Sequence, residues 1–268
     1  MSARILRVYA ILYLVFLYLP VILLPVFAFN DGTIIAFPLN GFTTAWFVEL
    51  TAIPALHEAL ANSLIIALAT AVLSTTLGVF AARASTRFRF PGKAGIMGFI
   101  MVPLVLPEII VAVSLLVVLL QLGLSLSIWS VILGHTLICT PFCIAILSSS
   151  FSGLDRSLEE AAIDLGETRL SAFRLVILPL VTPGIIASLL ISFTISLDEF
   201  IIAFFLTGTE PTLPVYIWSQ LRFPQKLPVI MALGTILIVL SLILIGTAEM
   251  LRRRGLRKSG QQDAGGFL

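Results

Sequence analysis

Apolar residues fall into six long runs along the chain, and the charged and turn-forming residues lie mainly between these runs. A helix needs about 20 residues to cross the ~30 Å hydrocarbon core of a bilayer, and each run reaches that length. The pattern predicts a single all-α membrane domain, residues 1–268, with six transmembrane helices. The predicted spans are residues 7–29, 60–82, 96–120, 129–150, 180–206 and 229–251.

The composition supports a membrane protein. Hydrophobic residues make up 59% of the chain and charged residues 11%, whereas an ordinary soluble domain has about 25% charged residues. The first run follows Arg4 and Arg7 and exceeds the apolar length of a signal peptide, so it is predicted to be a retained span. The net charge of +2 is not gathered in one basic patch, and nucleic acid is not expected as a partner.

Lysine and arginine follow an alternating topology. All but two of the 16 lie before the first span, after the second, after the fourth or after the sixth, the exceptions being Arg222 and Lys226. Because such residues are retained on the cytoplasmic side, both termini and the loop at 83–95 are predicted to be cytoplasmic. The segment at about 151–179 and a short arginine-rich tail, 252–268, share that side, and 30–59 and 207–228 lie outside.

The segment after the fourth span has the pattern of a soluble helical hairpin. Ser157 with Glu160 three residues later is typical of a capping box, which begins a helix near residue 157. Gly166 favours the left-handed conformation that ends this helix. A second helix is predicted through Leu170, Phe173 and Arg174, and Pro179 and Pro183 flank the start of the fifth span.

The polar face of the first hairpin helix is acidic. It carries Glu159, Glu160, Asp164 and Glu167. A helix lying on lipid headgroups would instead carry basic residues, so a protein partner is the better interpretation. The small residues Ala161 and Ala162 would allow that partner to approach closely.

Three acidic residues lie within predicted spans: Glu108, Asp198 and Glu199. A charge at the bilayer centre costs about 2.5 kcal/mol or more, so such acids tend to face a pathway or a partner. In a helix, Ser188, Ser192, Ser196 and Glu199 share one face, with Asp198 beside it. Two interpretations remain open. The acids and serines line a water-filled pathway for an ammonium-bearing solute, or the serines permit tight packing while the acids accept hydrogen bonds.

Other features indicate a bend and give no sign of chemistry. Pro103 and Pro107 remove two helix hydrogen bonds just before Glu108, which predicts a kink in the third span. Cys139 and Cys143 are interpreted as small buried residues, and His135 as a hydrogen-bonding residue in helix packing. The chain has no phosphate-binding loop and no evident catalytic or metal-binding constellation, so it is not expected to be an enzyme.

The hairpin also carries a family resemblance. The hairpin contains Glu160-Ala161-Ala162, then Gly166 after three intervening residues, and then Val-Ile-Leu-Pro at 176–179 after nine more. This pattern resembles the EAA motif of binding-protein-dependent ABC importer permeases. Val176 in place of the family's Ile is the only departure. Segments 103–109, 196–200 and 212–218 are similar to those of the permease II branch of spermidine/putrescine importers, although that branch often has Asp-Asp where this chain has Asp198-Glu199.

The resemblance implies a type I importer permease in a bacterial inner membrane. It assigns the hairpin as the coupling element that docks on a separate ABC ATPase dimer, through Glu160, Ala161, Ala162 and Gly166. ATP and Mg²⁺ would be bound by that dimer, with no cofactor on this chain. A second permease subunit, in a heterodimer or a homodimer, and an extracytoplasmic solute-binding protein are the other expected partners.

The substrate implied is a small cationic amine, with spermidine or putrescine first. Relatives with similar segments carry opines, aminophosphonates or 4-aminobutyrate, so these amino compounds remain alternatives. The candidate pathway residues are Glu108, Ser192, Ser196, Asp198 and Glu199. A secondary transporter is a further alternative, but it commonly has paired broken helices in an internal repeat. A scaffold without transport would leave the intramembrane acids unexplained.

Overall fold

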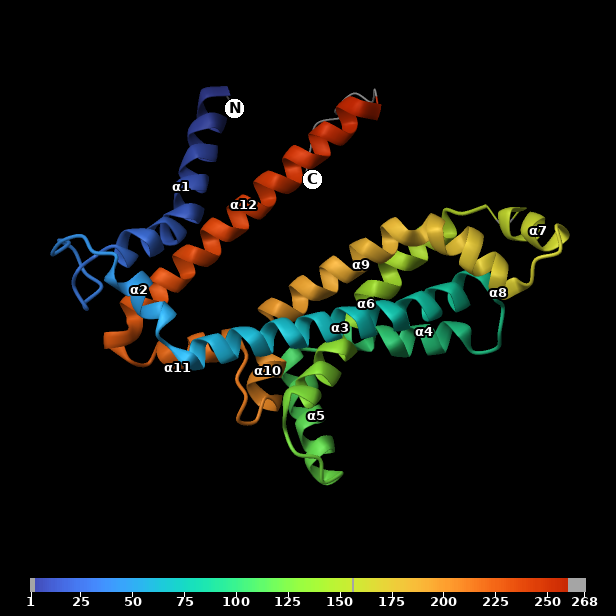
Figure 1. Cartoon of the computed structure of the whole chain (residues 1–268), viewed down its shortest axis with the longest axis horizontal. Helices are drawn as coiled ribbons and strands as arrows, with labels where there is room; N and C mark the ends of the chain where they lie inside the picture. Colours follow the sequence, from blue (N-terminus) through green and yellow to red (C-terminus); the bar gives the residue numbers. More distant parts are fainter. Residues whose placement is uncertain (1–2, 156, 260–268) are drawn as a thin grey trace. The chain divides into compact units, whose positions relative to one another are not determined.

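The computed structural model describes residues 3–155 and 157–259, which are nearly all helical. The chain divides into two compact units, one formed by 1–54 with 217–268 and the other by 55–216. Figure 1 colours the helices in chain order.

The first unit is built from α1 (Ala3–Ala28), α2 (Ala45–Thr51) and α12 (Leu227–Ser259), with α12 contacting both α1 and α2. Trp46 Nε1 donates to the carbonyl oxygen of Asn30 at 2.8 Å, which holds α2 against the end of α1. Most α1 side chains are exposed and apolar, as expected of a helix that faces lipid. α12 continues past residue 252 to Ser259, so the first part of the predicted tail is helical. The rest of the predicted tail, 260–268, lies outside the described residues.

The second unit holds most of α3 (Pro54–Arg87) and the helices that pack against it. α6 and α9 lie side by side in Figure 1, and their contact is the most extensive in the chain. The helices of this unit that follow α3 are α4 (Lys93–Met101), α5 (Glu108–Gln121), α6 (Ile128–Ser152), α7 (Ser157–Asp164), α8 (Arg169–Ala172), α9 (Leu178–Asp198) and α10 (Ile201–Leu206). The next helix, α11 (Leu213–Gln220), crosses the boundary between the units.

Two apolar clusters form the core of the second unit. One joins α3, α5, α6 and α10 through residues that include Ile66, Val131 and Ile202. The other joins α3, α6 and the helix after the hairpin through residues that include Leu147 and Ile177. α3 is therefore buried along one face by both clusters.

Within the described residues, five helices are long and apolar enough to cross a membrane, and a bent pair of helices makes a sixth candidate span. That pair, Lys93–Leu104 with Glu108–Gln121, bends by 103°. The predicted kink at Pro103 and Pro107 is confirmed, and it is sharp enough to break the third span into two helices. The reason is that two prolines four residues apart remove neighbouring backbone donors.

The fifth predicted span, 180–206, is wrong in extent. One helical stretch runs from Arg169 to Asp198 and includes a π-helical turn at Phe173–Ile177, so the hairpin's second limb continues directly into the span. The stretch ends before Glu199, whose backbone is extended, and α10 begins at Ile201. Pro179 lies within this stretch, directly after the π-helical turn.

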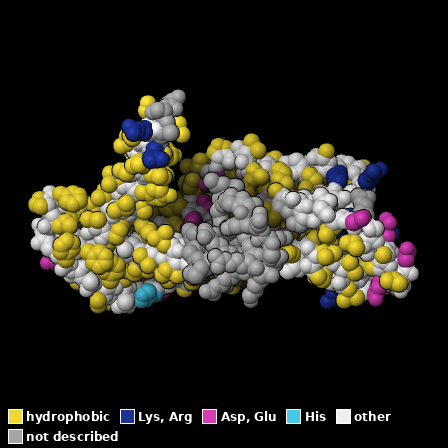
Figure 2. Space-filling model, turned by 90° about the horizontal axis from the view of Figure 1, so that it is seen from above, with side chains coloured by type: hydrophobic (Ala, Val, Ile, Leu, Met, Phe, Trp, Pro, Cys, Tyr) yellow, Lys and Arg dark blue, Asp and Glu magenta, His cyan; other side chains and the backbone are white. Residues whose placement is uncertain are grey.

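The surface of the second unit carries charged side chains of both signs at one end. Figure 2 shows acidic side chains gathered around the hairpin, next to broad hydrophobic areas. The hairpin acids Glu160, Asp164 and Glu167 are exposed. This distribution separates a lipid-compatible body from a hydrophilic projection.

Candidate functional site

The first hairpin helix, α7, begins where the sequence predicts, but a different residue caps it. Ser157 is the first helical residue, and its backbone N–H donates to Asp155 Oδ1 at 3.0 Å. This hydrogen bond holds the pKa of Asp155 below its usual range. The predicted box, with Ser157 as the cap and Glu160 as its partner, is therefore corrected to a cap by Asp155.

The turn that ends α7 depends on glycine. Gly166 has φ of 96°, where an L side chain is strained. Its N–H donates to the carbonyl of Ile163 at 2.9 Å, and the N–H of Glu167 donates to that of Ala162 at 3.1 Å. These two bonds make a Schellman motif, and the predicted left-handed Gly166 is confirmed. The second limb then starts with Thr168, whose hydroxyl accepts from the Ser171 N–H at 3.2 Å.

The four predicted coupling residues do not all face outward. Glu160, Ala161 and Gly166 are exposed, but Ala162 is buried with 8% of its surface accessible. Ala162 thus packs within the second unit, and the surface available for close approach is that of Glu160, Ala161 and the glycine turn. A role of these residues in docking stays a prediction.

The serine stripe of α9 forms a buried polar seam with α3 and α6. The Ser192 hydroxyl lies 3.0 Å from that of Ser74 and 2.9 Å from the thiol of Cys143. The Ser196 hydroxyl lies 2.7 Å from His135 Nδ1. The three serines of α9, which are Ser188, Ser192 and Ser196, are all buried. These are the contacts of the packing interpretation, and neither Ser192 nor Ser196 lines the two pockets described below.

The carboxylate of Glu199 is a structural cap. It is 7% exposed and accepts the backbone N–H groups of Ile202 at 3.0 Å and Ala203 at 3.1 Å, which start α10. His135 Nε2 lies 3.1 Å from the second carboxylate oxygen, within ion-pair distance but not aligned for a hydrogen bond. Asp198, one residue earlier, is exposed. The neighbouring acids therefore have different environments, and the expectation that Glu199 shares a continuous helix with the serines is wrong.

Glu108 lies at the break in the third span. It is exposed at the first position of α5, directly after the extended Pro107. A carboxylate there is favoured by the helix dipole. Glu108 also lines a pocket of about 310 Å³ with Phe142, Ile138, Ile195 and the turn around Pro103. The pocket combines one acid, one aromatic ring and apolar walls.

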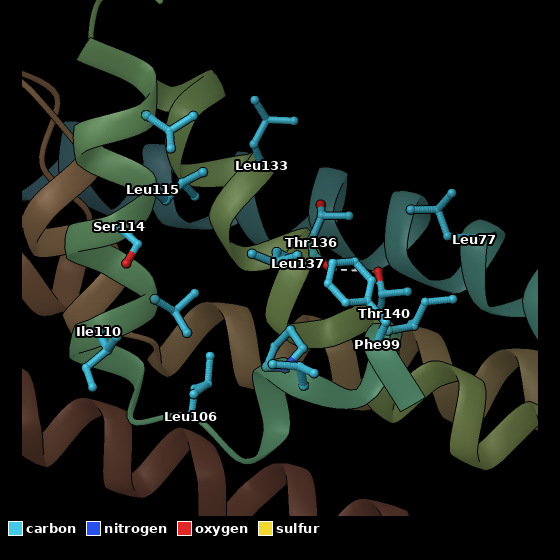
Figure 3. Close-up of a pocket in the computed structure, with 15 residues that line it drawn as sticks. Leu77, Phe99, Leu106, Ile110, Ser114, Leu115, Leu133, Thr136, Leu137 and Thr140 are labelled. Atoms are coloured by element: carbon cyan, nitrogen blue, oxygen red, sulfur yellow. Dashed lines mark hydrogen bonds between the residues drawn. The ribbon is translucent and has the colours of Figure 1, made fainter. Parts of the chain in front are cut away.

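A second, larger pocket at the same break is apolar. It has a volume of about 600 Å³ and is lined by α3, α4, α5 and α6. Figure 3 shows Leu106, Ile110, Leu133 and Leu137 on its walls, with Ser114, Thr136 and Thr140 among them. No charged group is among the described lining residues, so this pocket does not suit a charged solute.

The described residues contain no group of three or more His, Cys, Asp or Glu that could hold a metal ion. Cys139 and Cys143 are buried free thiols. Cys139 Sγ lies 3.8 Å from the Ser192 carbonyl oxygen, in the helix interface. His135 is fully buried between Ser196 and Glu199, which agrees with its interpretation as a packing residue.

Sequence comparison identifies a family match and close relatives. Residues 74–255 match the model of the family described as "Binding-protein-dependent transport system inner membrane component". The spermidine/putrescine transport system permease protein PotC of Escherichia coli (strain K12) is 36% identical over 241 residues, covering 89% of this chain and 90% of that protein. The putrescine transport system permease protein PotI of the same strain is 37% identical over 234 residues, covering 83% and 82%.

A solved structure has the same fold. It is the bacterial alginate ABC transporter in complex with its alginate pentasaccharide-bound periplasmic protein, with a TM-score of 0.71 and 20% identity. The match covers 94% of this chain and 93% of that one. The breaks at Glu108 and Glu199 thus occur within a fold that solved ABC importer permeases share.

Proposed function

The chain belongs to the family of binding-protein-dependent transport system inner membrane components, and from this membership we propose that it forms half of the pathway by which an ATP-driven importer carries a small cationic amine. It is a multi-pass permease subunit of the inner membrane. The observation that carries the proposed substrate, spermidine or putrescine, is the 36% identity to PotC over nine-tenths of that protein.

The ATPase is proposed to dock on the hairpin formed by α7 and α8. Support comes from the exposed Glu160 and Ala161 and from the tight turn at Gly166, which together form a projecting acidic surface. ATP and Mg²⁺ are bound by the ATPase dimer in this proposal. A second permease subunit completes the pathway in this proposal. The six candidate spans of one subunit, one of them broken, do not easily enclose a translocation pathway by themselves.

A solute-binding protein is proposed to deliver the amine at the outer side. The topology predicted from lysine and arginine places segments 30–59 and 207–228 there. A periplasmic protein is part of the structurally similar alginate transporter complex. Nucleotide binding would then move the hairpins and reorient the spans between outward and inward access.

The pocket beside Glu108 is the proposed contact for an ammonium group. A carboxylate attracts a cation strongly in a medium of low dielectric, and the ring of Phe142 offers a face for a cation–π contact. Asp198 is exposed near the end of α9 and is a second candidate. Glu199 is a weaker one, because its oxygens are already occupied by α10 and His135.

The test uses the complete complex in proteoliposomes, with uptake of radiolabelled putrescine, spermidine and 4-aminobutyrate measured beside ATP hydrolysis. We expect Glu108→Gln to lower apparent affinity for the di- and polyamine about 5- to 150-fold, as loss of one charge-assisted contact worth about 1–3 kcal/mol implies. ATP hydrolysis should fall less, and uptake of zwitterionic 4-aminobutyrate should be less affected.

The matched control is Glu58→Gln, which removes an exposed acid at the start of α3. Unchanged uptake of every amine in Glu108→Gln would show that the carboxylate is not a substrate contact. Preferred uptake of 4-aminobutyrate by the unmodified complex would move the substrate to the alternative amino compounds. Uptake without a copurifying ATPase would favour a secondary transporter.

A further inference from the structure

The cytoplasmic end of α3 is bound to the hairpin by one arginine with two partners. Arg83 Nη2 lies 3.1 Å from Glu159 Oε1, and the side chains are only 18% and 21% exposed. The guanidinium carbon also lies 3.9 Å from the centre of the Phe173 ring. Glu159 belongs to α7 and Phe173 begins the π-helical turn of the second limb. Arg83 therefore contacts both limbs of the hairpin.

One helical turn further along, α3 makes another contact with the hairpin's base. Arg87 Nη2 donates to the carbonyl oxygen of Leu154 at 3.1 Å. Leu154 lies in the connection between α6 and α7. The hairpin is thus held to α3 at its base and on both limbs, by charged groups that make directional contacts.

The opposite end of α3 is bound to the segment before α11. Asn62 Nδ2 donates to the carbonyl oxygen of Pro211 at 3.2 Å. The backbone N–H of Leu213 donates to Ser63 Oγ at 2.8 Å. The segment 207–213 lies on the outer side in the predicted topology, where the binding protein is proposed to dock.

α3 joins these two ends without a break. It is one helix of 34 residues. The 20 residue steps from Ser63 to Arg83 span about 30 Å at 1.5 Å per step, which is the thickness of the hydrocarbon core. The route along the hairpin's own chain is different, because α9 ends at Asp198 and α10 starts only at Ile201. A continuous helix transmits displacement along its axis better than two helices separated by an extended residue.

We propose that α3 is the rigid link that carries nucleotide-driven movement of the hairpin to segment 207–213, and that Arg83 is the positioning residue that attaches the hairpin to it. The proposal rests on the proposed function, since it needs an ATPase on the hairpin. In physical terms, the hairpin and segment 207–213 are coupled because both contact α3.

The experiment measures hydrogen exchange in the purified complete complex, with and without AMP-PNP and Mg²⁺. In the unmodified complex, nucleotide changes amide exchange in 207–213. In Arg83→Gln that change is lost while ATPase still copurifies, because the coupling between the two sites is broken. Exchanging the charges, Arg83→Glu with Glu159→Arg, restores at least part of the response. Arg89→Gln, which removes an exposed arginine just beyond α3, leaves the response intact.

A second variant tests the far end. Asn62→Ala should reduce the response in 207–213 while nucleotide-dependent exchange in the hairpin itself is kept. A full response in Arg83→Gln with bound ATPase overturns the inference but leaves the proposed function standing. If the unmodified chain recovers no ATPase, the proposed function fails and the inference fails with it. Loss of ATPase binding in Arg83→Gln alone overturns the positioning role, because Arg83 would then be needed for docking.

Discussion

The most direct test of the structure is to separate the two adjacent acids at the end of α9. Glu199 accepts two backbone N–H groups of α10 and lies beside His135, all of them buried. Asp198 is exposed. The two carboxylates are neighbours in sequence, so replacing each by its amide compares their two environments.

The expected cost of Glu199→Ala follows from what it leaves behind. Two buried N–H groups at the start of α10, those of Ile202 and Ala203, would lose their acceptor. Each buried donor left unsatisfied costs about 1–3 kcal/mol, so the total cost is about 2–6 kcal/mol. Glu199→Gln keeps one acceptor oxygen and should cost about 1–3 kcal/mol. Asp198→Asn should change stability by less than about 0.5 kcal/mol, as expected of an exposed position.

The assay is thermal unfolding of the detergent-solubilised protein, followed by fluorescence-detected size exclusion. At roughly 2–4 °C per kcal/mol, Glu199→Ala lowers the midpoint by about 4 °C or more, and Asp198→Asn by about 2 °C or less. Amide exchange at Ile202 and Ala203 should rise in Glu199→Ala, since those are the donors that lose their acceptor. Equal destabilisation by Glu199→Gln and Asp198→Asn, or unchanged exchange at the two amides in Glu199→Ala, would refute the assignment of Glu199 as a cap.

Two further predictions concern packing and docking. Gly134→Ala should destabilise the protein by about 1–3 kcal/mol in the same thermal assay. The reason is that the added Cβ would lie 2.5 Å from Ile202 Cγ2 and 2.9 Å from Leu206 Cδ1. The control Gly98→Ala, which has open space around the added Cβ, should not lower the midpoint. Glu160→Lys and Gly166→Trp should lose the ATPase in a pulldown while membrane insertion is kept. The first variant reverses a charge on the exposed face, and the second strains a left-handed turn. Normal ATPase association in both variants would contradict the docking proposal.

Local features of this protein follow from the sequence alone. The six apolar runs, the helix start at Ser157, the left-handed Gly166 and the kink after Pro103 and Pro107 each depend on residues within one or two turns of each other. The EAA motif is also local, and the family match agrees with it. Such features are readable because backbone conformation and hydrophobic length are set by neighbouring residues.

Contacts between distant residues were decided by the tertiary structure. The periodicity of α9 places Ser192 and Ser196 on one face, but it does not say that α3 and α6 cover that face with Ser74, Cys143 and His135. The contact of Arg83 with Glu159 joins residues 76 positions apart and has no local signature.

The acids Asp198 and Glu199 illustrate the limit of prediction from local sequence. Their order in the chain predicts that both lie on one helix, but the helix ends between them because the Glu199 carboxylate binds the first N–H groups of the next helix. A buried donor must find an acceptor, and which acceptor it finds depends on the packing of α6, α9 and α10. The sequence by itself determined the apolar runs and the position of the hairpin; only the fold decided where the fifth span ends, which carboxylate is a cap and which is exposed.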